Sequence, residues 1–103
     1  MSYFVVTREP GPAWDRACAM TDQVGWPEHA GFMNQLVAEG FVLLGGPVGG
    51  GERVLLVVRA SSEAAIHARI ATDPWTPLRL LPIVRIDPWQ ILLGNPVRVR
   101  SAS

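Results

Sequence analysis

Lysine is absent from this chain of 103 residues, and all nine of its basic residues are arginines. Schiff-base chemistry, a catalytic lysine and the lysine of a phosphate-binding P-loop are therefore excluded. Nine acidic residues balance the arginines, so the formal net charge is zero. Because nucleic-acid binders present an excess of positive charge, neither DNA nor RNA is expected as a partner.

Cysteine, histidine and long apolar runs are also scarce. Cys18 is the single cysteine, which excludes an internal disulfide and a cysteine-based zinc site. His29 and His67 are the only imidazoles, so a histidine-rich metal site is not expected, and no metal or other cofactor is predicted. No stretch approaches the roughly 18 apolar residues of a membrane span, and the N-terminus does not resemble a signal peptide. We expect a soluble, cytoplasmic protein with no membrane partner.

The order of the expected elements is strand, helix, strand, strand, helix, strand. The strands are expected at 3–7, 41–44, 54–59 and 80–86, and the helices at 27–39 and from Ser61 or Ser62 to the residue pair Asp73-Pro74. This order predicts an α+β, ferredoxin-like βαββαβ fold with both helices on one side of an antiparallel sheet. Residues 1–103 form one domain, with an excursion at 8–26 that has room for about two helical turns and a tail at 94–103.

Two of the expected strands are apolar on both faces. Residues 41–44 and 54–58 lack the alternation of apolar and polar side chains that a half-exposed sheet shows. Two helices cover one face of such a sheet, so the second face needs another cover. For a chain this short the simplest cover is a second copy, which predicts a homodimer through the sheet faces, a dimeric α+β barrel.

The first helix carries a histidine on its inner face. Helical spacing places His29 on one stripe with four apolar residues, namely Phe32, Met33, Leu36 and Val37. A neutral histidine is buried at low cost only when its ring nitrogens find hydrogen-bond partners. A polar group is therefore expected opposite His29.

Asp73 is the expected partner, because it leaves the second helix on the side that faces the first. An aspartate that accepts a hydrogen bond from one ring nitrogen fixes the tautomer and leaves the other nitrogen for proton transfer. His29 and Asp73 are thus the candidate catalytic residues. Two structural alternatives stay open: Asp73 as a helix terminator that bonds its own backbone, and His29 as a buried residue with no role in chemistry.

Candidate substrate-binding residues surround this pair. Trp26 and Trp75 lie close to it in the sequence, while core or interface packing is the alternative for each. Phe32 and Met33 would add apolar walls. Gly46 and Pro47 follow the second strand, where the backbone can approach a small ligand closely, although residues 45–53 also suit a flexible hairpin loop. His67 is expected at the surface beside Glu63.

The combination of these motifs resembles the YCII-related (YciI-like) family over nearly the whole chain. The matching segments are Trp26-Pro27-Glu28-His29-Ala30-Gly31-Phe32-Met33, Leu44-Gly45-Gly46-Pro47 and Ala71-Thr72-Asp73-Pro74-Trp75. The resemblance implies a dimeric α+β barrel and a His–Asp pair in the active site, here His29 and Asp73. A minority of the family is linked to lyase-like elimination steps in the degradation of aromatic compounds, so the resemblance makes such a reaction one expectation for this chain. The 8–26 excursion departs from the shorter members.

Two functions of different classes follow. The first is a cofactor-independent acid–base enzyme, a lyase, dehydrohalogenase or isomerase, acting on a small organic substrate, aromatic compounds included. The second is a non-catalytic small-ligand-binding or regulatory domain, in which His29 and Asp73 form a structural hydrogen bond. A cofactor-free monooxygenase on the same barrel is a third and less favoured interpretation.

Overall fold

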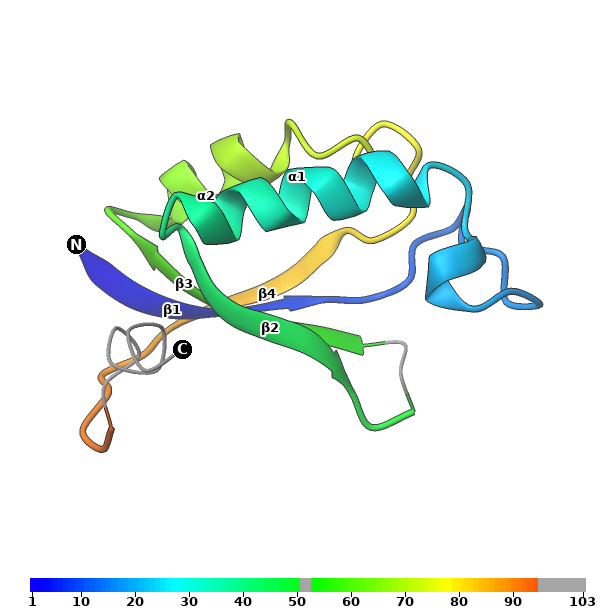
Figure 1. The fold of residues 1–103 in the computed structure, drawn as a ribbon. Coiled ribbons are helices and arrows are strands. Elements are labelled where there is room, and N and C mark those ends of the chain that lie inside the picture. The colour runs from blue at the N-terminus through cyan, green and yellow to red at the C-terminus, as the bar shows by residue number, and fades with distance from the viewer. Residues whose placement is uncertain (51–52, 95–103) are drawn as a thin grey trace.

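A computed structural model describes residues 1–50 and 53–94. The elements in chain order are β1 (Ser2–Arg8), the short 3-10 helix η1 (Met20–Asp22), α1 (Trp26–Ala38), β2 (Val42–Val48), β3 (Arg53–Ala60), α2 (Glu63–Ile70) and β4 (Ile83–Pro88) (Figure 1). The strands pair antiparallel in one sheet with the order β2-β3-β1-β4. This is the ferredoxin-like α+β arrangement that the sequence predicts.

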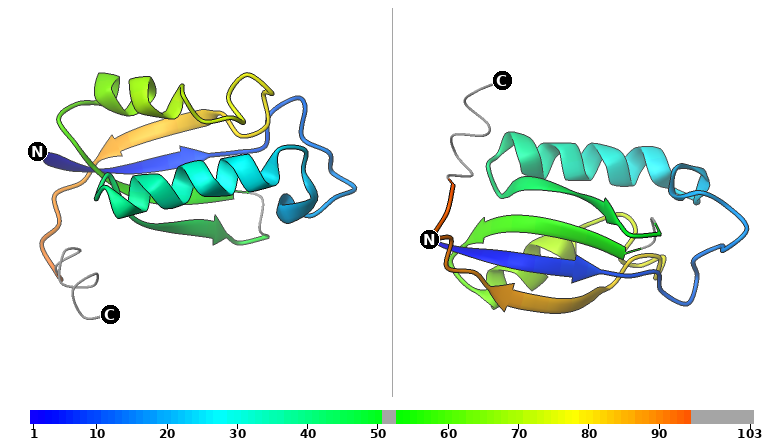
Figure 2. Two further views of the ribbon diagram at one scale, coloured as in Figure 1. Left: turned by 45° about the horizontal axis from the view of Figure 1, so that its top comes forward. Right: turned by 90° about the horizontal axis from the view of Figure 1, so that it is seen from below.

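Both helices lie on the same face of the sheet (Figure 1). Seen from below, the four strands lie in front of the helices (Figure 2). Two local signals start the helices: Gly25 precedes α1 with a φ of 75°, and the hydroxyl of Ser62 accepts a hydrogen bond from the backbone N–H of Ala65 at 3.1 Å. Gly40, with a φ of 80°, follows α1 as expected for a chain reversal.

Several boundaries differ from the sequence-based expectation. β2 continues through the glycines and Pro47 to Val48, because it is an edge strand and an edge tolerates a residue without an N–H. β4 starts at Ile83, since Leu80 and Leu81 are buried in the segment that precedes it. The 8–26 excursion contains only η1 and no two-turn helix. Most of the expected tail, residues 95–103, lies outside the described residues, as do residues 51 and 52 of the expected hairpin loop.

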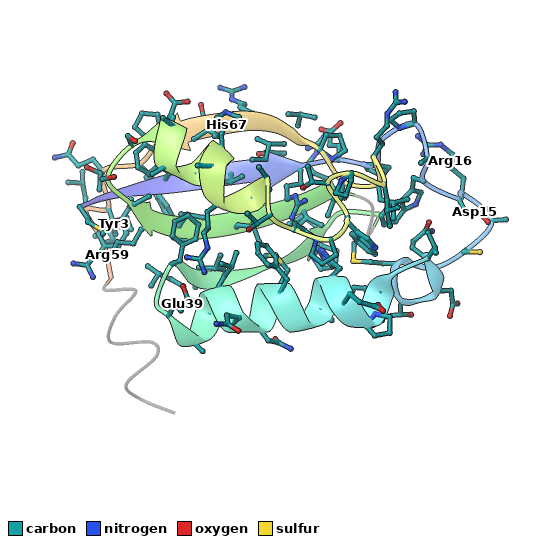
Figure 3. All side chains as sticks on the ribbon, turned by 90° about the horizontal axis from the view of Figure 1, so that it is seen from above. Tyr3, Asp15, Arg16, Glu39, Arg59 and His67 are labelled. Atoms are coloured by element: carbon teal, nitrogen blue, oxygen red, sulfur yellow. The ribbon has the colours of Figure 1, made fainter. Side chains whose placement is uncertain are left out.

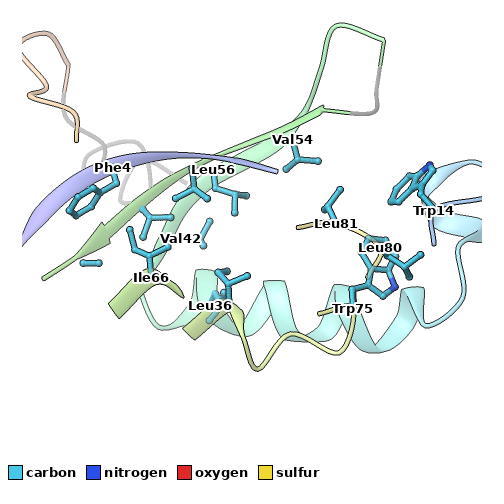
Figure 4. Close-up of a cluster of buried hydrophobic side chains, with 14 residues drawn as sticks. Phe4, Trp14, Leu36, Val42, Val54, Leu56, Ile66, Trp75, Leu80 and Leu81 are labelled. Atoms are coloured by element: carbon cyan, nitrogen blue, oxygen red, sulfur yellow. The ribbon is translucent and has the colours of Figure 1, made fainter. Parts of the chain in front are cut away.

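The core lies between the sheet and the helices (Figure 4). Alternate residues of β1 and β3 meet the inner residues of the helices and the segment after α2; the labelled members are Phe4, Leu36, Val42, Val54, Leu56, Ile66, Trp75, Leu80 and Leu81, with Trp14 from the excursion. Val37 was expected on the inner stripe but is 39% exposed. It lies about 80° around the helix axis from His29, which places it beyond the edge of the buried face.

The opposite face of the sheet is apolar at its centre. Val5, Leu55 and Val57 alternate with core residues and are half-buried, while Leu44 and Val84 are 47% and 52% exposed. No helix of residues 1–50 and 53–94 covers this face (Figure 2). No helix of that part of the chain is long and apolar enough to span a bilayer.

Candidate active site

Asp73 is the centre of a buried polar cluster. Its side chain follows the end of α2, and Nδ1 of His29 lies 2.9 Å from each of its two carboxylate oxygens. The hydrogen bond expected between these residues is therefore present. The backbone N–H of Trp75 also donates to Oδ1 of Asp73 at 2.8 Å, so the local turn expected of an Asp-Pro sequence forms as well. Asp73 thus serves both the turn and the histidine.

Arg8 is the member of this cluster that sequence reasoning missed. Its Nη1 donates to Oδ2 of Asp73 at 2.9 Å and its Nε donates to the carbonyl of Leu81 at 2.8 Å, with only 1% of the residue exposed. The sequence placed Arg8 in a loop after the first strand. A usable signal was the period of two, because Phe4, Val6 and Arg8 point to the same buried face of β1.

The charges around Asp73 decide the tautomer of His29. Burial by itself would raise the pKa of the Asp73 carboxyl, but hydrogen bonds from His29 and the Trp75 backbone and the charge of Arg8 hold that pKa below its ordinary value. The carboxylate is therefore ionised and can only accept hydrogen bonds. Nδ1 of His29 must then carry a proton, so in the neutral form of the ring the lone pair lies on Nε2. Burial lowers the pKa of Arg8 and the Asp73 carboxylate opposes that shift, so Arg8 stays a cation and neutralises the carboxylate.

Trp75 holds the imidazole ring from one side. The two rings are stacked with centroids 3.8 Å apart and planes 8° from parallel. Nε1 of Trp75 donates to the carbonyl of Val24 at 2.7 Å, which ties the indole to the end of the excursion. Trp26 lies 5.8 Å from both rings. Trp26 and Trp75 therefore restrict the rotation of the His29 ring, as the hydrogen bond to the Asp73 carboxylate also does.

His29 lines a cavity of about 280 Å³ between α1 and the sheet. Most of its wall is apolar, and its polar residues are Arg8, His29 and Asn34; the other lining residues are Met20, Trp26, Ala30, Met33, Gly45, Gly46, Pro47, Val54, Leu56 and Leu81. Of the predicted binding residues, Trp26, Met33, Gly46 and Pro47 line this cavity. Phe32 packs against the core instead, and Trp75 lies behind the imidazole.

The strand register distinguishes the two glycines of β2. Gly45 pairs with the buried Leu56 and so faces the helices, whereas Gly46 pairs with Leu55 and faces the other side of the sheet. A Cβ at Gly45 would lie 2.5 Å from Cδ2 of Leu56, but a Cβ at Gly46 meets nothing within 4 Å. Gly45, which was not a predicted binding residue, is therefore the position that needs to lack a side chain on the cavity side.

Nε2 of His29 is the atom of this site that can act on a bound molecule. It makes no hydrogen bond within residues 1–50 and 53–94, although every fully buried side-chain nitrogen and oxygen there has a partner. Solvent therefore reaches Nε2.

His67 is exposed on α2 and forms no ion pair or hydrogen bond with Glu63 within residues 1–50 and 53–94. No group of three potential metal ligands occurs among those residues.

Comparison with solved structures finds a similar chain fold. The chain resembles 5-chloro-2-hydroxyhydroquinone dehydrochlorinase from Burkholderia phenoliruptrix AC1100, solved in complex with 2,5-dihydroxybenzoquinone, with a TM-score of 0.59 and 20% sequence identity. The match covers 85% of this chain and 93% of the dehydrochlorinase chain. No family model matches the sequence, and no curated protein matches it. At this identity the similarity establishes a shared fold.

Proposed function

We propose that the protein is a cofactor-independent enzyme that transfers protons on a small single-ring organic substrate, with His29 as general base and acid. The observation that carries this proposal is the direction of the imidazole. Asp73 holds Nδ1, and the Nε2 lone pair is accessible beside an apolar cavity. Asp73, Arg8 and Trp75 are positioning residues in this proposal, because each acts through His29 or its partner.

The cavity favours a flat, largely apolar substrate with a few oxygen substituents. An engineered apolar cavity of about 150 Å³ in another protein holds benzene, so about 280 Å³ accommodates one substituted ring. Trp26 and Met33 supply apolar contacts, and Asn34 supplies a polar group. Arg8 lines the same cavity but is 1% exposed and paired with Asp73, so it acts on the substrate only through Asp73 and His29.

Elimination of hydrogen chloride from a chlorinated hydroxyaromatic compound fits these groups. In the keto tautomer of such a compound, Nε2 of His29 takes the hydroxyl proton. The O–H electron pair becomes a C=O bond, the double bond shifts, and the C–Cl bond breaks with chloride leaving. The step requires no oxidant or cofactor. The similar fold of a chain named as a dehydrochlorinase supports this choice within the lyase and isomerase classes.

The experiment that tests the proposal is a screen of chlorinated and hydroxylated single-ring compounds, followed by chloride release and absorbance. With a substrate identified, His29→Gln should lower kcat by about 10²–10⁴, because glutamine can still donate to Asp73 but cannot shuttle a proton. Glu63→Gln is the control, since Glu63 is exposed at the start of α2. A loss below tenfold in His29→Gln would remove the histidine from the mechanism.

A non-catalytic ligand-binding domain is the second candidate, and the burial of the cluster favours it. Asp73 is 1% exposed and accepts hydrogen bonds from three residues, so the pair is structural whatever else it does. Thermal unfolding of an Asp73 variant therefore does not separate the two functions. The distinction rests on turnover by the wild type: a binder binds some of the screened compounds, turns none of them over, and keeps its affinity for them in His29→Gln.

The apolar sheet face supports a homodimer as part of the same proposal. Leu44 and Val84 are exposed at a face that a second copy would cover through a two-fold axis. Sedimentation at micromolar concentration should give about twice the monomer mass. Leu44→Glu should yield monomers, while Val37→Glu, at a similarly exposed apolar residue on α1, should leave the mass unchanged. A wild-type chain that sediments as a monomer refutes the dimer.

A further inference from the structure

A second cavity, of about 360 Å³, lies near the end of α2 and on the start of β4. Its wall combines the last turn of α2, the segment that follows it and one proline of the 8–26 excursion. The lining residues are Arg8, Pro12, His67, Ile70, Ala71, Trp75, Thr76, Arg79, Leu80, Leu81, Pro82 and Ile83. Only Arg8 and Leu81 are shared with the cavity of His29. The two cavities are therefore distinct spaces on either side of the buried arginine.

The wall of this second cavity carries positive charge without a carboxylate. Arg79 and His67 stand among its lining residues, and neither side chain forms an ion pair or hydrogen bond within residues 1–50 and 53–94. Asp73 is the nearest acidic group by sequence and is already bound to Arg8 and His29. His67 lies on the side of α2 that is remote from α1 (Figure 3). An anion entering here therefore meets basic groups and no acidic lining residue.

The backbone of Arg79 adds an independent observation. Arg79 has a φ of 60°, the single positive value among the non-glycine residues described. This left-handed conformation favours glycine or asparagine and costs free energy for a longer side chain. Its N–H donates to the carbonyl of Thr76 at 3.1 Å, so the conformation belongs to a tight turn. Glycine would satisfy the backbone of this turn at no conformational cost, but the chain has an arginine there, and that arginine lines the cavity.

Most of the remaining wall is apolar. The apolar lining residues that a ligand can reach are Pro12, Pro82 and Ile83. Ile70, Trp75 and Leu80 are almost fully buried behind them. Apolar walls with a few polar groups at one side are typical of sites for small amphipathic molecules. We infer that this cavity binds a small organic carboxylate, with its carboxylate paired to Arg79 beside His67 and its apolar body against Pro82 and Ile83.

Benzoate and its neutral counterpart benzamide test this inference. In an NMR titration of the labelled wild-type chain, benzoate should shift the signals of Arg79, His67 and Ile83 in a saturable way, and benzamide should bind about tenfold more weakly. Arg79→Asn, which suits the positive φ, should lower the affinity for benzoate by about tenfold. Arg16→Gln removes one positive charge at the outer end of the excursion (Figure 3) and should leave the affinity unchanged.

Three results would overturn the inference. Equal affinities for benzoate and benzamide would show an apolar pocket with no preference for anions. Shifts confined to His29 and Ala30 would place benzoate in the other cavity. An unchanged affinity in Arg79→Asn would remove the proposed ion pair. None of these measurements depends on catalysis, so the inference stands or fails separately from the proposed enzyme.

Discussion

The tripeptide Asp-Pro-Trp occurs twice in this chain, and its two copies have opposite environments. In residues 73–75 the aspartate is 1% exposed and the tryptophan fully buried, whereas Trp89 in residues 87–89 is 45% exposed. Asp73 joins Arg8, His29 and the Trp75 backbone. Among residues 1–50 and 53–94, Asp87 binds only Arg85, two residues away on the same strand, at 2.7 Å.

The difference shows that surroundings, and not local sequence, make the first copy a candidate site. Both copies lie at the C-terminal end of a regular element: α2 ends three residues before Asp73, and β4 ends at Pro88. The first follows a helix packed on the sheet, and its aspartate points into the layer between α1, α2 and β1. The second ends an edge strand, where water competes for the carboxylate and an ion pair contributes little.

The largest expected contrast is in stability between the two aspartates. Asp73→Ala leaves Arg8 and His29 without their acceptor and should lower the free energy of unfolding by about 3–5 kcal/mol. Asp87→Ala loses only an exposed pair and should lower it by less than about 1 kcal/mol. Urea denaturation of both variants measures the difference. Similar losses for the two would mean that the buried cluster does not stabilise the fold.

A smaller contrast is expected between the two tryptophans. Trp75→Phe removes the donor to the Val24 carbonyl and part of the ring stacked on His29, and should cost about 2 kcal/mol. Trp89→Phe should change stability by no more than about 0.5 kcal/mol, because Trp89 bonds Tyr3 through its backbone N–H, which phenylalanine retains. Thermal unfolding ranks the two. A larger loss in the Trp89 variant contradicts the assignment.

The smallest expected effect is the change in the free energy of unfolding when the pH is lowered. The pKa of Asp73 lies below its ordinary value of 3.8 in the folded chain, so its charged form stabilises the fold above that value. This contribution is lost as the pH falls from the ordinary pKa through the folded one. Denaturation of the wild type from neutral pH to about pH 3 should show the loss. Asp87→Asn should retain the same acid-dependent component, and Asp73→Asn should lack it.

Local patterns were sufficient for the order of the main helices and strands and for two residues of the site, His29 and Asp73. Helical spacing placed His29 on an inner face, and the order of strands and helices predicted the ferredoxin-like sheet, because both depend on side chains near each other in the chain. The same patterns misjudged β2, where glycine and proline normally mark a loop. Its edge position, which permits them, is a property of the assembled sheet.

The sequence by itself determined the fold class, the inward histidine and the aspartate that meets it. Only the tertiary structure decided that Arg8 completes the cluster, that Trp75 stacks on the imidazole, and that a Cβ at Gly45, but not at Gly46, would lie on the cavity side of the sheet. The reason is separation along the chain: Arg8 and Asp73 are 65 residues apart. No local period links such residues, and their contact exists because the strand and the segment after α2 pack together.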